Sequence, residues 1–279
     1  MKKKKVKRIL LYLFLILVTV FMIYPIVWLF FGSFKSNAEI FGTADLLPTN
    51  WSLEAFKEGW KKAGGYTFTL FFKNSFLLVV PTVLCTIVSS TLVAFGFARF
   101  NFPFKKLLFG MMIATLMLPN AVLIIPRYLL FRNLSWLNGY KPFIVPAALA
   151  TSGFFNYLLI QFFRGIPREL DESAKIDGCN SLQILLYILA PLMKPAIVSV
   201  TIFQFIWTWN DFFNSMIYIN STDKFTVSLG LRLAIDSSAA TNYSEVLAMA
   251  VLAIVPCILI YIFAQEYFVE GVATTGLKG

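Results

Sequence analysis

Histidine is absent from the 279 residues of this chain, and charged residues are scarce. Without histidine there is no Ser-His-Asp triad and no HExxH zinc site, so most schemes of general-base hydrolysis are excluded. Asp, Glu, Lys and Arg make up 14% of the chain, whereas roughly a quarter is usual in soluble proteins. Apolar residues make up 58% and form long runs. The composition predicts an integral membrane protein with little chemistry of its own.

Cysteine is also rare. Cys85, Cys179 and Cys257 are isolated and lie in or beside apolar segments. Disulfide frameworks and metal clusters need paired or clustered spacing. We therefore expect these residues to be small packing residues, and we expect no metal site.

The positive charge is concentrated at the N-terminus. Six of the 24 basic residues lie within the first eight positions, directly before an apolar run, and they account for much of the net charge of +10. Such a cluster orients a first membrane span and can contact anionic lipid headgroups. The distribution therefore predicts contact with the bilayer and no nucleic-acid partner. The run 9–31 holds 23 residues without a charge, too long for the roughly 7–15-residue core of a cleavable signal peptide.

Six apolar runs predict an all-α membrane protein with a single domain over 1–279. A helix needs about 20 apolar residues to cross a bilayer. The expected spans are about 9–31, 74–98, 107–126, 142–163, 191–210 and 246–265. Lys194 and Pro195 interrupt the start of the fifth span, where a lysine can reach the interface. Prolines remove a backbone bond and are expected to kink the spans at Pro25, Pro119, Pro146 and Pro256.

Basic residues predict that both termini are cytoplasmic. With the N-terminus inside, the inner segments 1–8, 99–106, 164–194 and the tail hold 14 Lys and Arg, and the outer segments hold 10. Part of the outer count comes from the long segment 32–73, whose charges carry little weight in orientation. The segment 164–190 is then cytoplasmic.

A polar, helix-prone island interrupts the apolar runs at Glu172-Ser173-Ala174-Lys175-Ile176-Asp177-Gly178. Pro167 favours a helix start, and acids in the first turn favour its N-terminal end. A helix over 168–177 is expected to end at Gly178. Asn180 and Gln183 have the spacing of a capping box for a second helix over 181–190, which would end before Pro191. The segment is predicted to form a helix–turn–helix at the membrane surface.

This island resembles the "EAA" loop of ABC-importer permeases, with Ser173 in place of the usual second alanine. The resemblance implies the type I ABC-importer permease fold, in which a cytoplasmic coupling helix contacts a separate ATPase. It assigns this coupling role to Glu169, Glu172, Ser173, Ala174, Asp177, Gly178, Leu182, Ile188 and Pro191.

Other segments resemble the carbohydrate-uptake branch of the same family, in particular the second membrane subunit of maltose-type importers. They are residues 165–170 before the island, 209–212 at the outer end of the fifth span, and the C-terminal 265–271 and 276–279. The spacing of Gly271 and Gly276 mimics a nucleotide-binding loop, but Leu277 follows where such a loop has lysine. We therefore expect no nucleotide site in this chain.

The resemblance implies a non-enzymatic subunit in the cell (inner) membrane that imports a sugar or oligosaccharide by alternating access. The chain needs no cofactor, because ATP would be bound by its partners. Those partners would be a second, homologous permease subunit, a pair of ABC ATPase subunits and an extracellular or periplasmic solute-binding protein.

A sugar path needs hydrogen-bonding side chains and aromatic faces within an apolar wall. In the fifth span, Gln204, Trp207, Thr208 and Asp211 share one helical face. Asn120 and Asn156 are further candidates. Alternatively, these polar side chains hold helices together.

Three other functions stay open at this point. The same machine could import another solute, such as a polyamine or phosphonate. An ion-coupled secondary transporter usually has inverted repeats and charges at mid-membrane, and this sequence shows neither. A membrane enzyme would have few catalytic groups available.

Overall fold

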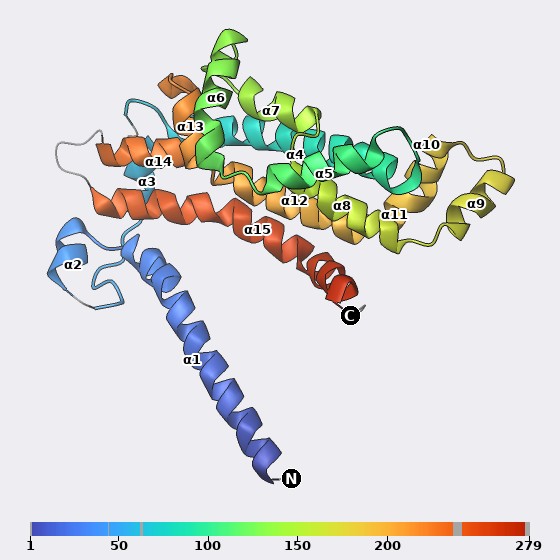
Figure 1. The fold of residues 1–279 in the computed structure, drawn as a ribbon. Coiled ribbons are helices and arrows are strands. Elements are labelled where there is room, and N and C mark those ends of the chain that lie inside the picture. The colour runs from blue at the N-terminus through green and yellow to red at the C-terminus, as the bar shows by residue number, and fades with distance from the viewer. Residues whose placement is uncertain (1, 44, 62–63, 237–241, 277–279) are drawn as a thin grey trace. The chain divides into compact units, whose positions relative to one another are not determined.

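The computed structural model describes residues 2–43, 45–61, 64–236 and 242–276, and it contains no strand within them. The chain is helical throughout (Figure 1), as the composition predicts. The longer helices are α1 (Lys2–Gly32), α4 (Phe68–Arg99), α5 (Lys105–Leu116), α6 (Asn120–Asn133), α8 (Gly153–Gly165), α12 (Lys194–Trp209), α14 (Val227–Asp236) and α15 (Tyr243–Gly276). The shorter helices are α2 (Asn37–Gly42), α3 (Glu54–Lys61), α7 (Lys141–Ala148), α9 (Glu169–Ile176), α10 (Ser181–Gln183), the π-helix η1 (Ile184–Leu189), α11 (Ala190–Leu192), α13 (Phe212–Tyr218) and the 3₁₀ turn η2 (Thr222–Lys224).

The chain divides into two compact units. The first contains Met1–Leu70 and Leu229–Val255, and the second contains Phe71–Ser228 and Pro256–Gly279. The sequence predicts one domain over 1–279, and that single-domain organisation stays a prediction. The segment 164–190 and all the predicted path residues belong to the second unit.

Within the described residues, four helical segments are long and apolar enough to cross a bilayer. They are Lys5–Gly32, Phe68–Arg99, Lys141–Gly165 and Tyr243–Glu266. Two further pairs of helices qualify if each bent pair counts as one span, which would give six. In the second unit the core lies between α4, α8, η1 and α12, and its fully buried side chains include Leu159, Phe163, Leu189 and Met193.

The third predicted span differs from the structure. Where the sequence predicts one helix over 107–126, the structure has α5 and α6, which meet at 106°. Pro119 explains the break, because a proline disfavours the helical conformation in the residue before it and donates no hydrogen bond. Pro119 is the N-cap of α6, so it separates two helices instead of kinking one. Pro25, Pro146 and Pro256 lie inside α1, α7 and α15.

The fifth predicted span also has a different beginning. The helical segment Ser181–Leu192 meets α12 at 78°, and Met193 lies at the break. The sequence predicts that the preceding helix ends before Pro191, which is wrong: α11 continues to Leu192. Pro191 therefore lies inside the last turn of the continuous helical segment Ser181–Leu192, just before the break at Met193.

Candidate functional site

The segment 164–190 folds as two short helical segments joined by a tight turn. Figure 1 shows α9 and α10 at one end of the second unit, beyond the last turns of α4 and α8. Acidic residues occupy the first turn of α9, and Lys175 lies in its last turn, as the helix dipole favours. The predicted helix 168–177 is thus present, with Arg168 and Asp177 as its flanking caps.

Gly178 ends α9 in the left-handed conformation, with φ of +85°. The N–H of Gly178 donates to the carbonyl of Lys175 at 3.0 Å, and the N–H of Cys179 donates to that of Ala174 at 2.9 Å. This pair of bonds is a Schellman motif, which satisfies the last carbonyls of a helix and reverses the chain. The turn therefore fixes the direction in which the next helix leaves.

Asn180 and Gln183 then start the second helical segment as a capping box. The Asn180 side chain accepts from the Gln183 N–H at 2.9 Å, and the Gln183 side chain accepts from the Asn180 N–H at 2.8 Å. The chain continues through η1, which is a π-helix. Because π-helices use i→i+5 bonds, the segment 184–189 shifts register, and Ile184, Leu185 and Leu189 are buried.

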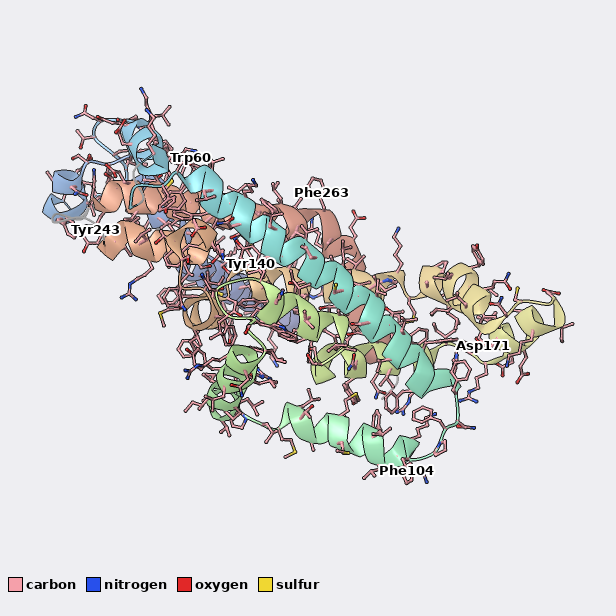
Figure 2. All side chains as sticks on the ribbon, turned by 90° about the horizontal axis from the view of Figure 1, so that it is seen from above. Trp60, Phe104, Tyr140, Asp171, Tyr243 and Phe263 are labelled. Atoms are coloured by element: carbon pink, nitrogen blue, oxygen red, sulfur yellow. The ribbon has the colours of Figure 1, made fainter. Side chains whose placement is uncertain are left out.

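An ion pair ties α9 to the end of α4. Arg99 Nε lies 2.7 Å from Asp171 Oδ2, and the two side chains are only 6% and 13% exposed. Figure 2 shows Asp171 beside the last turn of α4. Arg99 also donates to the Ile166 carbonyl at 3.1 Å, and Arg168 donates to the Ala98 carbonyl at 3.2 Å. Three side-chain contacts thus hold the start of α9 against α4.

One face of this segment packs inward. Ala174 is 3% exposed and belongs to the same core as Ala94, Ala98 and Ile184. Ile188 is partly buried against that core. The small side chain at position 174 allows α9 to approach the core closely.

The opposite face is open and apolar at its centre. Ile176 is 87% exposed, Tyr187 75%, Leu182 57% and Leu186 53%. The remaining residues predicted for coupling are also exposed, namely Glu169, Glu172, Ser173, Asp177, Gly178 and Pro191. Ser173 donates to the Leu170 carbonyl at 3.1 Å, so its hydroxyl is used within its own helix. An exposed apolar patch rimmed by acids is typical of a protein-docking surface.

The predicted path residues fall into separate places in the second unit. Gln204 donates to Thr208 at 2.6 Å on α12, and Trp207, on the same helix, is 48% exposed. The Trp207 ring lies 5.2 Å from those of both Phe154 and Phe155 on α8, measured between centroids. The structure therefore brings an amide, a hydroxyl and an aromatic cluster together along α12.

Asn156, directly after Phe155 in the first turn of α8, is 5% exposed, and its side-chain amide donates to the Ala150 carbonyl at 2.7 Å. Its carbonyl oxygen has no hydrogen-bond partner within the described residues. Asn120 lies at the start of α6, is exposed, and accepts from Arg127 at 3.5 Å. The recorded contacts therefore do not join Asn120 to the α12 cluster.

Asp211 caps a different helix. Its carboxylate accepts from the Asn214 N–H at 3.1 Å and from the Asn214 amide at 2.9 and 3.1 Å, at the start of α13. Burial raises the pKa of this carboxyl, and the bonds from Asn214 partly oppose the rise. Asp211 therefore has a local structural role in addition to its predicted position along the path.

Sequence reasoning missed Arg99 and Arg168 as parts of this site. Both are basic residues at the ends of helices, and such residues are usually read only as orientation signals. The contact of Arg99 with Asp171 depends on how α4 and α9 pack, which the spacing within either segment does not reveal.

Residues 86–274 match the family model for the binding-protein-dependent transport system inner membrane component. The chain belongs to this family. An arabinooligosaccharides transport system permease protein of Bacillus subtilis (strain 168) is 31% identical over 277 residues, which cover 98% of this chain and 97% of that protein. An sn-glycerol-3-phosphate transport system permease protein of Brucella abortus (strain 2308) is 30% identical, and the match covers 98% of this chain and 99% of that protein. A diacetylchitobiose uptake system permease protein of Streptomyces coelicolor is 29% identical, with 90% and 83% covered.

The fold agrees with this membership. A chain from the crystal structure of a bacterial ABC transporter involved in the import of the acidic polysaccharide alginate superposes with a TM-score of 0.85 at 23% identity, with 96% of this chain and 98% of that chain covered. A second alginate transporter structure was solved in complex with a periplasmic protein bound to an alginate pentasaccharide. Its matching chain superposes with a TM-score of 0.66 at 16% identity, with 94% of this chain and 95% of that chain covered. The predicted all-α permease fold is confirmed. Membership of this family also disfavours the ion-coupled transporter and the membrane enzyme.

Proposed function

We propose that this permease is driven by ATP bound to separate ATPase subunits, which dock on the segment 164–190. The observation that carries the proposal is the exposed apolar face of that segment, centred on Ile176 and Tyr187. Such side chains at a membrane surface need a protein partner to bury them. The residues assigned to this contact are Glu169, Glu172, Ser173, Ala174, Asp177, Gly178, Leu182, Ile188 and Pro191.

These residues have different tasks in the proposed contact. Leu182 lies on the docking face, while Glu172 and Asp177 supply acidic groups at its rim for basic groups of the ATPase. Ala174 and Ile188 transmit the contact inward, because they pack against the core. Gly178 holds the turn, and Pro191 lies near the end of the second helical segment, before the 78° bend.

Alternating access then follows from the contacts of α9. When the ATPase subunits close, they displace α9, and the Arg99–Asp171 pair transmits this displacement to α4. The shared core passes it on to α8 and α12, which carry Asn156 and the Gln204–Thr208 cluster. A packed core transmits such a shift because it has little free volume to absorb it.

The proposed substrate is a sugar or oligosaccharide. Two of the relatives above are named for arabinooligosaccharides and diacetylchitobiose. The exposed part of Trp207, with Phe154 beside it, offers an aromatic face, and Gln204 offers an amide next to it. Aromatic faces combined with a few polar groups suit a neutral, hydroxyl-rich ligand. The proposed path contains Asn120, Asn156, Gln204, Trp207, Thr208 and Asp211.

The remaining partners follow from the same proposal. A second, homologous permease subunit would complete the path, and a solute-binding protein would deliver the sugar at the outer face. The relative named for sn-glycerol-3-phosphate shows that close relatives carry names of different solutes, so the substrate needs its own test. We infer that both termini are cytoplasmic, which the basic residues of 1–8 and 99–106 support.

Substitution at the centre of the docking face tests the proposal. In the assembled transporter, Ile176→Asp is expected to abolish co-purification of the ATPase subunit and solute uptake, with the permease still inserted. Leu53→Asp is the matched control, because Leu53 is 70% exposed but lies in the segment predicted to be outside. Retention of the ATPase by the Ile176 variant would overturn the proposed docking site.

The substrate class is tested separately at Trp207. Trp207→Ala is expected to reduce oligosaccharide uptake, and Trp207→Phe is expected to retain most of it, because the phenyl ring keeps an aromatic face. Uptake that responds equally to both substitutions would argue against sugar stacking at this position.

A further inference from the structure

A hollow lined by arginines lies beside the proposed docking surface and shares Glu169 with it. Its volume is about 430 Å³, and it lies between the last turn of α4 and the segment 164–169. Three guanidinium groups line it, those of Arg99, Arg164 and Arg168, together with the single carboxylate of Glu169. Lys105, at the start of α5, is close enough to be repelled by Arg164 and Arg168.

Only one of these three guanidinium groups forms an ion pair. Arg99 is paired with Asp171, whereas Arg164 and Arg168 form no ion pair with any carboxylate within the described part of the chain. Arg164 lies 4.9 Å from the centre of the Phe109 ring, and Arg168 gives one hydrogen bond to the Ala98 carbonyl. Each guanidinium has five N–H donors, so most of the donors of Arg164 and Arg168 stay available.

An anion in the hollow would offset the repulsion between these positive charges. Like charges that gather at one place repel each other, and a guanidinium fork matches the oxygens of a phosphate group. The three membrane helices α4, α5 and α8 end or begin here, at Arg99, Lys105 and Gly165. The ends of membrane-spanning helices are expected near the level of the lipid headgroups.

We propose that Arg164 and Arg168, supported by Lys105, form a binding site for a phosphate group, supplied by the headgroup of an anionic phospholipid. The occupant would bridge the end of α8 and the N-cap of α9, because Arg164 and Arg168 belong to these two positions. Anionic lipid would then steady the segment that the ATPase moves. This consequence rests on the proposed coupling role, whereas the binding itself does not.

The role of basic residues in orienting membrane spans does not by itself explain why these arginines share one hollow. Basic residues that only favour the cytoplasmic side act through their number and need no shared hollow. A specific site instead predicts saturable binding that depends on two particular arginines.

The test uses the purified full-length protein in nanodiscs of phosphatidylcholine with increasing phosphatidylglycerol, and native mass spectrometry counts retained lipids. The wild type is expected to retain phosphatidylglycerol in a saturable manner. R164Q/R168Q is expected to bind it about tenfold more weakly. R164K/R168K, which keeps the charge but loses the fork, should lie between the two. Lys175→Gln is the control for loss of one positive charge in the same segment, since Lys175 is exposed in α9 and does not line this hollow.

A second arm distinguishes the source of the phosphate. Inorganic phosphate is added to phosphatidylcholine nanodiscs and to those holding phosphatidylglycerol. Little displacement of the lipid supports the lipid source, whereas full displacement at millimolar concentration assigns the site to soluble phosphate and overturns the lipid proposal. Equal lipid retention by R164Q/R168Q and wild type would overturn the site. So would a double variant that keeps its lipid and loses only the ATPase subunit, which would identify the arginines as protein contacts.

Discussion

Arg99, the last residue of α4, lies 2.7 Å from Asp171 in α9, and both side chains are almost fully buried. The pair links a long membrane helix to the short helix that carries the proposed docking face. Removing one partner leaves a buried charge without compensation, which costs far more than removing both.

Asp171→Asn is therefore expected to destabilise the protein by about 3 kcal/mol and to loosen the segment 164–190. The double variant Arg99→Met/Asp171→Leu should cost less than the sum of the two single substitutions, because it leaves no unpaired charge. Thermal unfolding in detergent and limited proteolysis of the segment measure the two effects. Strict additivity of the single substitutions would show that the ion pair does not act as a unit.

A second prediction concerns the turn at Gly178. A left-handed φ costs a residue with a Cβ about 1–2 kcal/mol, and no atom lies within 4 Å of the Cβ that an alanine would add. Gly178→Ala should therefore weaken the turn without a steric clash, and Gly178→Asp should abolish uptake while the protein stays inserted. Uptake in the assembled transporter is the measurement.

Gly165→Ala is the matched control for this prediction. Gly165 lies in the same segment, has open space around it and does not have a positive φ. If alanine reduced uptake equally at both glycines, the left-handed turn would not be the cause.

A third prediction concerns Asn138, which joins two segments of the second unit. Its backbone φ is +57°. Its side-chain oxygen Oδ1 accepts from the backbone N–H groups of Asn220 and Ser221 at 3.2 and 3.0 Å. Its amide donates to Ser221 Oγ at 2.7 Å. Asn138→Ala loses these hydrogen bonds and is also strained, because its Cβ disfavours the left-handed φ. Asn138→Gly loses only the hydrogen bonds.

Alanine should therefore destabilise more than glycine at this position, by about 1 kcal/mol. Thermal unfolding of the two variants in the same detergent gives the comparison. If glycine proved as costly as alanine, the hydrogen bonds alone would account for the role of Asn138.

Local features of the candidate site could be predicted from the sequence. Gly178 after a helix-prone run and the Asn180–Gln183 spacing depend on contacts within a few residues, and the structure has both the turn and the capping box. Such motifs carry their own hydrogen-bond geometry, so no tertiary information is needed.

Features that depend on packing could not be predicted. The Arg99–Asp171 pair joins helices far apart in the chain, and neither segment alone indicates its partner. The π-helix over Ile184–Leu189 has the composition of an ordinary apolar helix, so its register comes from the burial of its side chains. Pro119 was recognised as a disruption, but whether it kinks or separates helices depends on what each half packs against.

The last prediction uses the raised pKa of Asp211. Burial favours the neutral carboxylic acid, so the folded pKa lies above the ordinary value of 3.8. A raised folded pKa means that the stabilising contribution is fully present below 3.8 and is lost as the pH rises through the folded pKa. Asp211→Asn is uncharged at every pH and keeps one oxygen to accept from the Asn214 N–H.

The melting temperature of Asp211→Asn relative to wild type should therefore rise as the pH is raised from about 4 through the folded pKa of Asp211. Asp223→Asn is the control, because Asp223 is an exposed acid in the 3₁₀ turn η2. A constant difference between wild type and Asp211→Asn over this range would mean that the carboxylate is compensated when ionised. The bonds from Asn214 would then balance the effect of burial, and Asp211 would act as an ordinary helix cap.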